Sequence, residues 1–235
     1  MREVYHEQLD RVSDDLVEMT HLVATAMQNA TKSLLDADLH LAEAVIAGDI
    51  LIDDVAAQVE ADCFQVSARQ QPVATDLRIV VAALRISASL ERMGDLAAHV
   101  AKAARMRYPA SAVPDELRPT FEEMGNVAYD VVTKTGLVIS TKDVARAADV
   151  AHTDEDMDRL HRQMFRTVLA PTWSHGVEAA VDVTLLSRFY ERFADHAVTI
   201  AKRVVYVATG EPYNLVDATA YSAGRLDRPA GTTSR

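Results

Sequence analysis

Residues 90–104 read LERMGDLAAHVAKAA, and residues 190–204 read YERFADHAVTIAKRV. The second stretch repeats the first at a shift of 100 residues. Upstream, DILID at 49–53 and DEDMD at 154–158 are related by a similar shift of 105. Two echoes in the same order indicate that one structural unit occurs twice in the chain. The residues shared by the longer pair are Glu91, Arg92, Asp95, Ala97, Ala101 and Lys102, which recur as Glu191, Arg192, Asp195, Ala197, Ala201 and Lys202.

The apolar residues of the chain recur with the spacing of a helix. Near the N-terminus they are separated alternately by three and four residues, which places them along one helix face. An alternation by two, as in a half-buried strand, does not extend over any useful length of the sequence. The N-terminal seam consists of Leu9, Val12, Leu16, Met19, Val23, Ala26 and Ala30.

Prolines divide the helical pattern into segments, because proline interrupts the hydrogen bonds of a helix. They stand at positions 72, 109, 114, 119, 171 and 212. We therefore predict an all-α fold of two repeated three-helix bundles, at 1–110 and 111–213, followed by a disordered tail at 214–235. The six predicted helices span residues 3–35, 37–70, 73–107, 116–140, 142–169 and 175–209.

Composition narrows the class of protein. Among 235 residues, 24 Lys and Arg stand against 35 Asp and Glu, which gives a net charge of −11. Such a chain is a poor nucleic-acid binder and has no polybasic patch for anionic lipid. The longest apolar run, at 79–84, is too short to span a membrane, and the charged start has no signal-peptide core. A single cysteine, Cys63, fits a reducing compartment, so we expect a cytoplasmic protein.

Each copy contains two pairs of carboxylates four residues apart, which project from one helix face. In an antiparallel helix hairpin, residues whose numbers share a sum lie level. The sum is 144 for the pairs 49/95 and 53/91, and 349 for the pairs 154/195 and 158/191. Each hairpin is therefore predicted to gather four carboxylates at one level. They are Asp49, Asp53, Glu91 and Asp95 in the first copy, and Asp154, Asp158, Glu191 and Asp195 in the second.

Four carboxylates on facing helices repel one another unless a cation lies between them. Hard divalent or trivalent cations such as magnesium, calcium, manganese or iron suit oxygen ligands, and zinc is a further candidate. We therefore interpret the eight carboxylates as metal ligands. The alternative is that they face water or pair with nearby arginines, for which the candidates are Arg92, Arg192, Arg85 and Arg159.

A di-iron oxidase or a metal-storage helical protein is the alternative function. Di-iron bundles use glutamates together with Glu-x-x-His motifs. The chain has Glu18-x-x-His21 and a similar Asp158-x-x-His161, but the repeated Glu91 is followed three residues later by Gly94. The sequence has no phosphate-binding glycine loop and no nucleophile elbow. We therefore predict no catalytic residues and no enzymatic activity.

Three stretches together resemble the PhoU family. They are GDILIDDVAAQVEADCFQVSARQQPVATDLR at 48–78, LERMGDLAAHVAK at 90–102 and ERFADHAVTIAKRVVYVATGE at 191–211. The QQPVATDLR segment at 70–78 is the most specific, and the resemblance extends over about residues 3–213. It implies a fold of two similar three-helix bundles, in agreement with the internal repeat.

The resemblance also implies a function. PhoU proteins carry an acidic motif in each repeat, here Glu91/Asp95 and Glu191/Asp195, that can bind metal clusters. They are negative regulators of phosphate uptake and of phosphate-starvation signalling. Their expected partners are the ATPase of the phosphate ABC transporter and a sensor histidine kinase, so the membrane is reached only through proteins. Members often form dimers, so a homodimer is expected. Arg78 lies in the most family-like stretch and is a candidate partner contact, and the alternative is that this arginine caps the helix or pairs locally after the turn. A helical scaffold without metal remains a further alternative.

Overall fold

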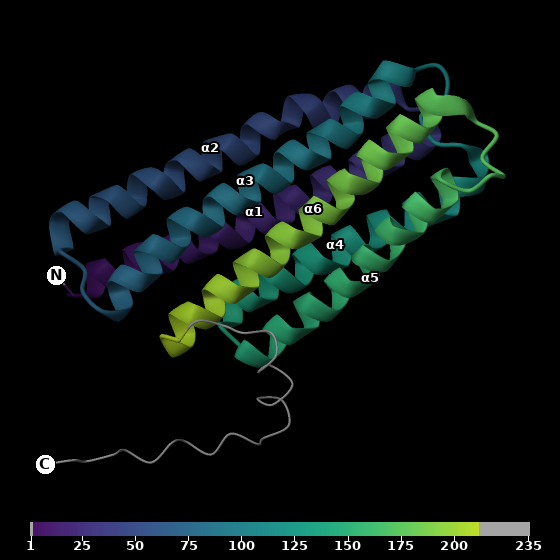
Figure 1. The fold of residues 1–235 in the computed structure, drawn as a ribbon. Coiled ribbons are helices and arrows are strands. Elements are labelled where there is room, and N and C mark those ends of the chain that lie inside the picture. Colours follow the sequence, from purple (N-terminus) through teal and green to yellow (C-terminus); the bar gives the residue numbers. More distant parts are fainter. Residues whose placement is uncertain (1, 212–235) are drawn as a thin grey trace, which may run out of the picture.

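Six long α-helices and one short 3₁₀ helix make up the computed structural model, which describes residues 2–211 (Figure 1). Every long helix begins and ends within two residues of its predicted range. The predicted tail at 214–235 lies outside the described residues. The elements are α1 (Arg2–Asp36), α2 (Leu39–Gln70), α3 (Thr75–Arg107), η1 (Asp115–Leu117), α4 (Arg118–Thr141), α5 (Val144–Val168) and α6 (Gly176–Thr209).

The helices form two three-helix bundles, which confirms the predicted fold class. Helices α1, α2 and α3 pack against one another, and so do α4, α5 and α6. The bundles meet where α1 packs against α4 and α3 packs against α6. Helices α2 and α5 therefore flank the molecule on opposite sides, as Figure 1 shows. No helix within residues 2–211 is both long and apolar enough to cross a membrane.

The helix ends follow from local chemistry. Asp38 caps α2, because its side chain accepts a hydrogen bond from the Leu41 amide at 3.0 Å. Asp143 caps α5 in the same way, through the Ala145 amide at 2.9 Å. At the other end of α2, Gln71 takes the left-handed conformation with φ 46° directly before Pro72. Asp38 and Asp143 thus define where α2 and α5 begin, and Gln71 ends α2 at the turn that Pro72 predicts.

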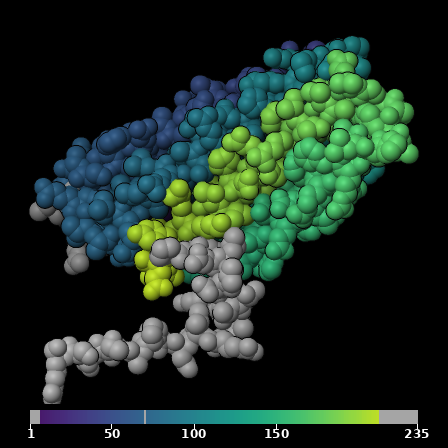
Figure 2. Space-filling view, viewed as in Figure 1, coloured from purple at the N-terminus to yellow at the C-terminus, as the bar shows by residue number. Residues whose placement is uncertain are grey.

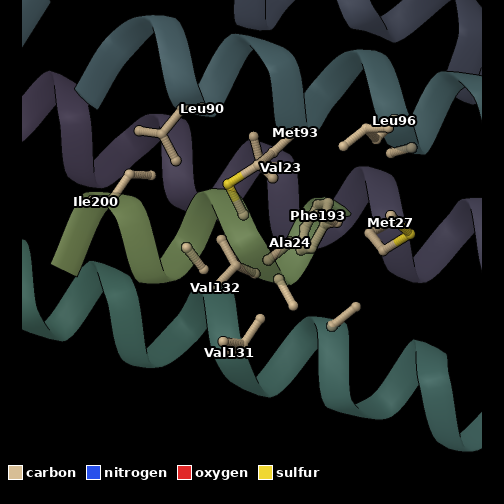
Figure 3. Close-up of a cluster of buried hydrophobic side chains, with 14 of the residues drawn as sticks. Val23, Ala24, Met27, Leu90, Met93, Leu96, Val131, Val132, Phe193 and Ile200 are labelled. Carbon is tan, nitrogen blue, oxygen red and sulfur yellow. The ribbon is translucent and has the colours of Figure 1, made fainter. Parts of the chain in front are cut away.

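The central core lies where the two bundles meet. Figure 3 shows side chains from α1, α3, α4 and α6 converging there, among them Met27, Met93, Val132 and Phe193, none of which is exposed to solvent. Burial of such apolar side chains contributes about 1.5–3 kcal/mol each. The predicted N-terminal seam is buried in this core except for Ala26, which is half-buried.

A buried polar contact joins the first helix to the last. The hydroxyls of Thr31 on α1 and Tyr190 on α6 lie 2.8 Å apart, and Tyr190 is fully buried. Gly125 on α4 lies directly against the same threonine. A Cβ at position 125 would be 2.5 Å from Thr31 Cγ2, so only glycine allows α4 to approach α1 this closely. The two copies are thus packed tightly together.

Candidate functional site

The α2–α3 hairpin brings the four carboxylates of the first copy together. Burial raises the pKa of Asp49, and the negative charges of Asp53 and Asp95 raise it further. Asp49 reaches across to the backbone of α3, because its Oδ1 lies 3.0 Å from where a Cβ on Gly94 would stand. One turn away, Asp53 and Glu91 line the same cleft of about 430 Å³. The level pairs predicted from the residue numbers are therefore real neighbours.

The α5–α6 hairpin gathers the second four carboxylates in the same way. Burial, followed by the charges of Asp158, Asp195 and Glu191 in that order, raises the pKa of Asp154 to about 6. Burial also raises the pKa of Glu191, followed by the charges of Asp195 and Asp158. All four predicted residues of the second copy thus act on one another across α5 and α6.

Nearby cations offset part of this repulsion. Arg92 Nη1 lies 2.8 Å from Asp95 Oδ2, and Arg188 pairs with Glu191. Arg162 is 3.8 Å from Asp158. Arg159 was a candidate partner of the predicted carboxylates. It instead contacts Glu123 and Asp156, which lie outside the cluster.

The chemistry of both clusters suits a hard cation, since every ligand they offer is a carboxylate oxygen. Within residues 7–69 and 71–211, however, no three His, Cys, Asp or Glu side chains come close enough together to enclose a metal ion. Arg92 and Arg188 each contact one of the predicted ligands, Asp95 and Glu191 respectively. Metal binding at the eight residues stays a prediction.

Other residues join the clusters that the sequence patterns had not assigned to them. Burial and neighbouring carboxylates raise the pKa of Asp49 and of Asp154. Lys102 and His99 offset part of the rise at Asp49, and Lys202 offsets part of the rise at Asp154. The lysines belong to the repeated stretch and stand seven residues after Asp95 and Asp195, which is two turns along the same face. That spacing was a usable signal.

The histidine of the Asp158-x-x-His161 motif has other contacts. His161 Nδ1 lies 3.0 Å from Ser187 Oγ, and its ring packs edge-on against Phe165. Burial, then the charge of Arg188, lower the pKa of His161, while Asp158 acts in the opposite direction.

Arg78, the predicted partner contact, lies in the first turns of α3. Its Nη2 donates to Thr75 Oγ1 at 2.9 Å, and its guanidinium packs against Gly210 at the end of α6. The carbonyl end of a helix favours a cation there. The predicted contact of Arg78 with a partner stays a prediction.

Two repeated three-helix bundles, each with an acidic hairpin, define an all-helical class of protein. The PhoU domain model matches residues 16–104 and 121–204, one match in each bundle. This chain therefore belongs to the PhoU family.

Two relatives from mycobacteria are similar in sequence over nearly the whole length of the chain. The chain is 50% identical over 210 residues to the phosphate-specific transport system accessory protein PhoU homolog 2 of Mycobacterium tuberculosis, covering 89% of this chain and 99% of that protein. It is 48% identical to PhoU homolog 1 of Mycobacterium leprae, covering 89% and 95% respectively.

Solved structures agree with the fold. PhoU from Pseudomonas aeruginosa superposes with a TM-score of 0.79 at 26% identity, covering 88% of this chain and all of that one. The regulatory protein PhoU from Streptococcus pneumoniae superposes with a TM-score of 0.80 at 23% identity, over 89% and 99% of the two chains. The arrangement of two bundles is thus a property of the family.

Proposed function

We propose that this protein is a cytoplasmic, non-enzymatic negative regulator of phosphate uptake and phosphate-starvation signalling. The observation that carries the proposal is its 50% identity, over 99% of the relative's length, to an accessory protein of the phosphate-specific transport system. The proposed partners are the ATPase of the phosphate ABC transporter and a sensor histidine kinase. The net charge of −11 suits a basic face on either partner, because complementary charge speeds encounter and gives specificity.

An exposed apolar face supports a function through protein contact. At the α5–α6 turn, Leu169 is 77% exposed and Val177 is 81% exposed, and Val181 and Leu185 are each half exposed. Contiguous apolar surface of this kind is typical of an interface. A partner protein or the second subunit of the proposed homodimer can cover it.

The first test is an affinity pull-down from phosphate-replete cells, read by mass spectrometry. We expect recovery of the transporter ATPase or the kinase, and weaker recovery with Val177→Ser combined with Leu185→Ser. Leu137→Ser, which removes an exposed leucine from α4, is the matched control. Deleting the gene is expected to leave phosphate uptake high in replete medium. Failure to recover either partner, together with unchanged uptake in the deletion strain, contradicts the proposal.

We further propose that the carboxylate clusters bind a hard divalent or trivalent cation. Burial raises the pKa of Asp49 and of Asp154, and the repulsion of neighbouring carboxylates raises both further. This supports the proposal, because a bound cation relieves that repulsion. Asp95→Asn with Asp195→Asn is expected to lower the metal content while helicity is retained. Elemental analysis of protein purified without chelator measures the former, and circular dichroism the latter. Unchanged metal in the double variant excludes these ligands.

A further inference from the structure

A cavity of about 590 Å³ lies between the N-terminal half of α3 and the C-terminal half of α6. Its walls combine apolar side chains with four cations, and no described Asp or Glu lines it. In a chain with 35 acidic residues and a net charge of −11, such a concentration of positive charge is unexpected. The four cations are Arg78 and Arg85 from α3, and Lys202 and Arg203 from α6.

The cations of this cavity have no acidic partner among the described side chains. Within residues 7–69 and 71–211 none of the four forms an ion pair. The Nε atoms of Arg78 and Arg203 are buried, and neither has a hydrogen-bond partner in the described part of the chain. A buried donor without a partner costs free energy, so it marks a place where a ligand is favoured.

Like charges also face each other across the cavity. Helices α3 and α6 are antiparallel, and level residues such as Arg78/Gly210 and Arg85/Arg203 have numbers that add up to 288. Burial, then the charge of Arg85, lower the pKa of the Arg203 guanidinium. Lys202 also acts on Asp154, and Arg78 lies at the carbonyl end of α6, which leaves Arg85 and Arg203 as the cations that the protein compensates least.

The opposite end of the same helix pair shows how the fold neutralises an arginine when it does so internally. There Arg107 of α3 pairs with both Glu178 and Asp182 of α6, with 2.6 Å between Arg107 Nε and Asp182 Oδ2. At the repeat shift of 100 residues, Glu178 and Asp182 correspond to Arg78 and Ala82. The cavity therefore lacks the acids that the second copy supplies at the equivalent place.

We propose that this cavity binds a small anion bearing more than one phosphoryl group, held by Arg78, Arg85 and Arg203. Guanidinium groups bind phosphoryl oxygens in a bidentate manner, and Arg suits such sites better than Lys. A phosphoryl group carries about 1.5–2 negative charges at pH 7, so a ligand with two such groups carries about three to four charges and is closer to the charge of three guanidinium groups than a single phosphate is. The volume is that of a small-molecule site. The inference does not depend on the proposed partners.

The test is calorimetric titration of the full chain with inorganic phosphate, pyrophosphate and tricarballylate, after metals are removed with a chelator. We expect saturable binding of pyrophosphate, weaker binding of phosphate and the weakest binding of tricarballylate. Arg85→Gln and Arg203→Gln are each expected to weaken pyrophosphate binding about 10- to 100-fold, the usual effect of losing a hydrogen bond to a charged group. Arg203→Lys keeps the positive charge but loses the planar guanidinium that binds a phosphoryl group through two parallel hydrogen bonds. We therefore expect its loss of pyrophosphate affinity to lie between those of the native chain and Arg203→Gln.

Arg105→Gln is the matched control, because it removes the same charge from an exposed site on the same helix. It stands 20 residues beyond Arg85, about 30 Å along α3. Absence of saturable pyrophosphate binding overturns the proposal. So does an equal loss of affinity in Arg105→Gln, tighter binding of tricarballylate or of an acidic peptide, or binding that returns only with added metal and ignores the arginine variants. Circular dichroism of each variant confirms that it is folded.

Discussion

The two copies of the three-helix unit keep their carboxylates and differ in the cations around them. Helix α3 carries Arg78 in its first turn and Arg85 two turns later, whereas the equivalent positions of α6 hold Glu178 and Leu185. The second copy closes its end of the α3–α6 contact with acids that pair with Arg107, while the first leaves its end positively charged. The difference teaches that the repeat preserves the backbone and the acidic hairpins, and that charge substitutions make the two ends of the α3–α6 contact electrostatically different.

The acidic hairpins differ in the same sense. Asp95 of the first copy is held by Arg92, whereas Glu191 of the second copy is held by Arg188, and position 88 is alanine. The pKa of Asp49 is raised, and that of Asp154 is raised to about 6. Burial first, and the repulsion of neighbouring carboxylates second, thus disfavour the ionised form more strongly in the second cluster.

The largest expected effect comes from making the first copy charge-balanced like the second. Arg85→Glu places a carboxylate opposite Arg203 and lets the protein neutralise its own cavity. We expect the affinity for pyrophosphate to fall more than about 100-fold, because an attractive charge becomes a repulsive one. Calorimetry measures the loss, with Arg105→Glu as the control. Retained affinity in Arg85→Glu places the anion elsewhere.

A smaller effect is expected from removing the repulsion in the second hairpin. Asp154→Asn keeps the shape of the side chain and removes its charge. The pKa of Asp154 is about 6 against 3.8 for a free side chain, so its ionised form is disfavoured in the folded state at pH 7. After allowance for solvent screening, we expect the free energy of unfolding to rise by about 1–2 kcal/mol in the presence of chelator.

Chemical denaturation of Asp154→Asn, Asp49→Asn and the exposed control Asp149→Asn measures this difference between the copies. We expect the free energy of unfolding to rise less for Asp49→Asn than for Asp154→Asn, and not to rise for Asp149→Asn. A gain at Asp49 equal to that at Asp154 contradicts the inequality of the two hairpins.

The same residue predicts a pH dependence. A carboxyl whose folded pKa lies above its unfolded value destabilises the fold above the folded pKa and has no such effect below the unfolded one. The advantage of Asp154→Asn over the native chain is therefore expected to shrink between pH 6 and about pH 4.

Measuring that advantage as a difference between two chains removes the contributions of other groups. Burial lowers the pKa of His161 and of His196, so both destabilise the fold as the pH falls through their unfolded value of about 6.5. Thermal melts of both chains from pH 7 to pH 4 give the difference directly. An advantage that stays constant over this range contradicts the assignment to Asp154.

The smallest effect is expected at Arg188. This arginine lowers the pKa of Glu191, so Arg188→Gln raises that pKa. Glu191 is mostly buried but Arg188 is half exposed, so we expect the free energy of unfolding to change by less than about 1 kcal/mol. Titration of the Glu191 side chain by NMR measures the shift. Arg162→Gln is the control, and an equal shift in that variant assigns the effect to general charge rather than to Arg188.

Local patterns made most of the fold predictable. Helix limits follow from apolar spacing, caps and prolines, all of which lie within a few residues of the element that they define. The carboxylate clusters were predictable as well, because a helix hairpin fixes which residues of Asp49–Asp53 and Glu91–Asp95 lie level.

The cavity between α3 and α6 was not predictable in this way. Arg85 and Arg203 come together only because the two copies pack in antiparallel fashion, and no short turn in the sequence specifies that register. The arginine partners of the acids were not predictable either. Arg159 contacts Glu123 of the neighbouring helix α4, and this contact depends on helix packing rather than on the spacing of residues in the sequence.

The buried contact between Thr31 and Tyr190 has a consequence for synthesis of the chain. The ribosome completes α1 long before it makes α6. The hydroxyl of Thr31 therefore lacks its contact with Tyr190 until translation is almost complete. During that interval the face of α1 that carries Met19, Val23 and Met27 lacks the cover of the second bundle. We therefore expect the nascent first copy to be prone to aggregation until the last helix packs against this apolar face.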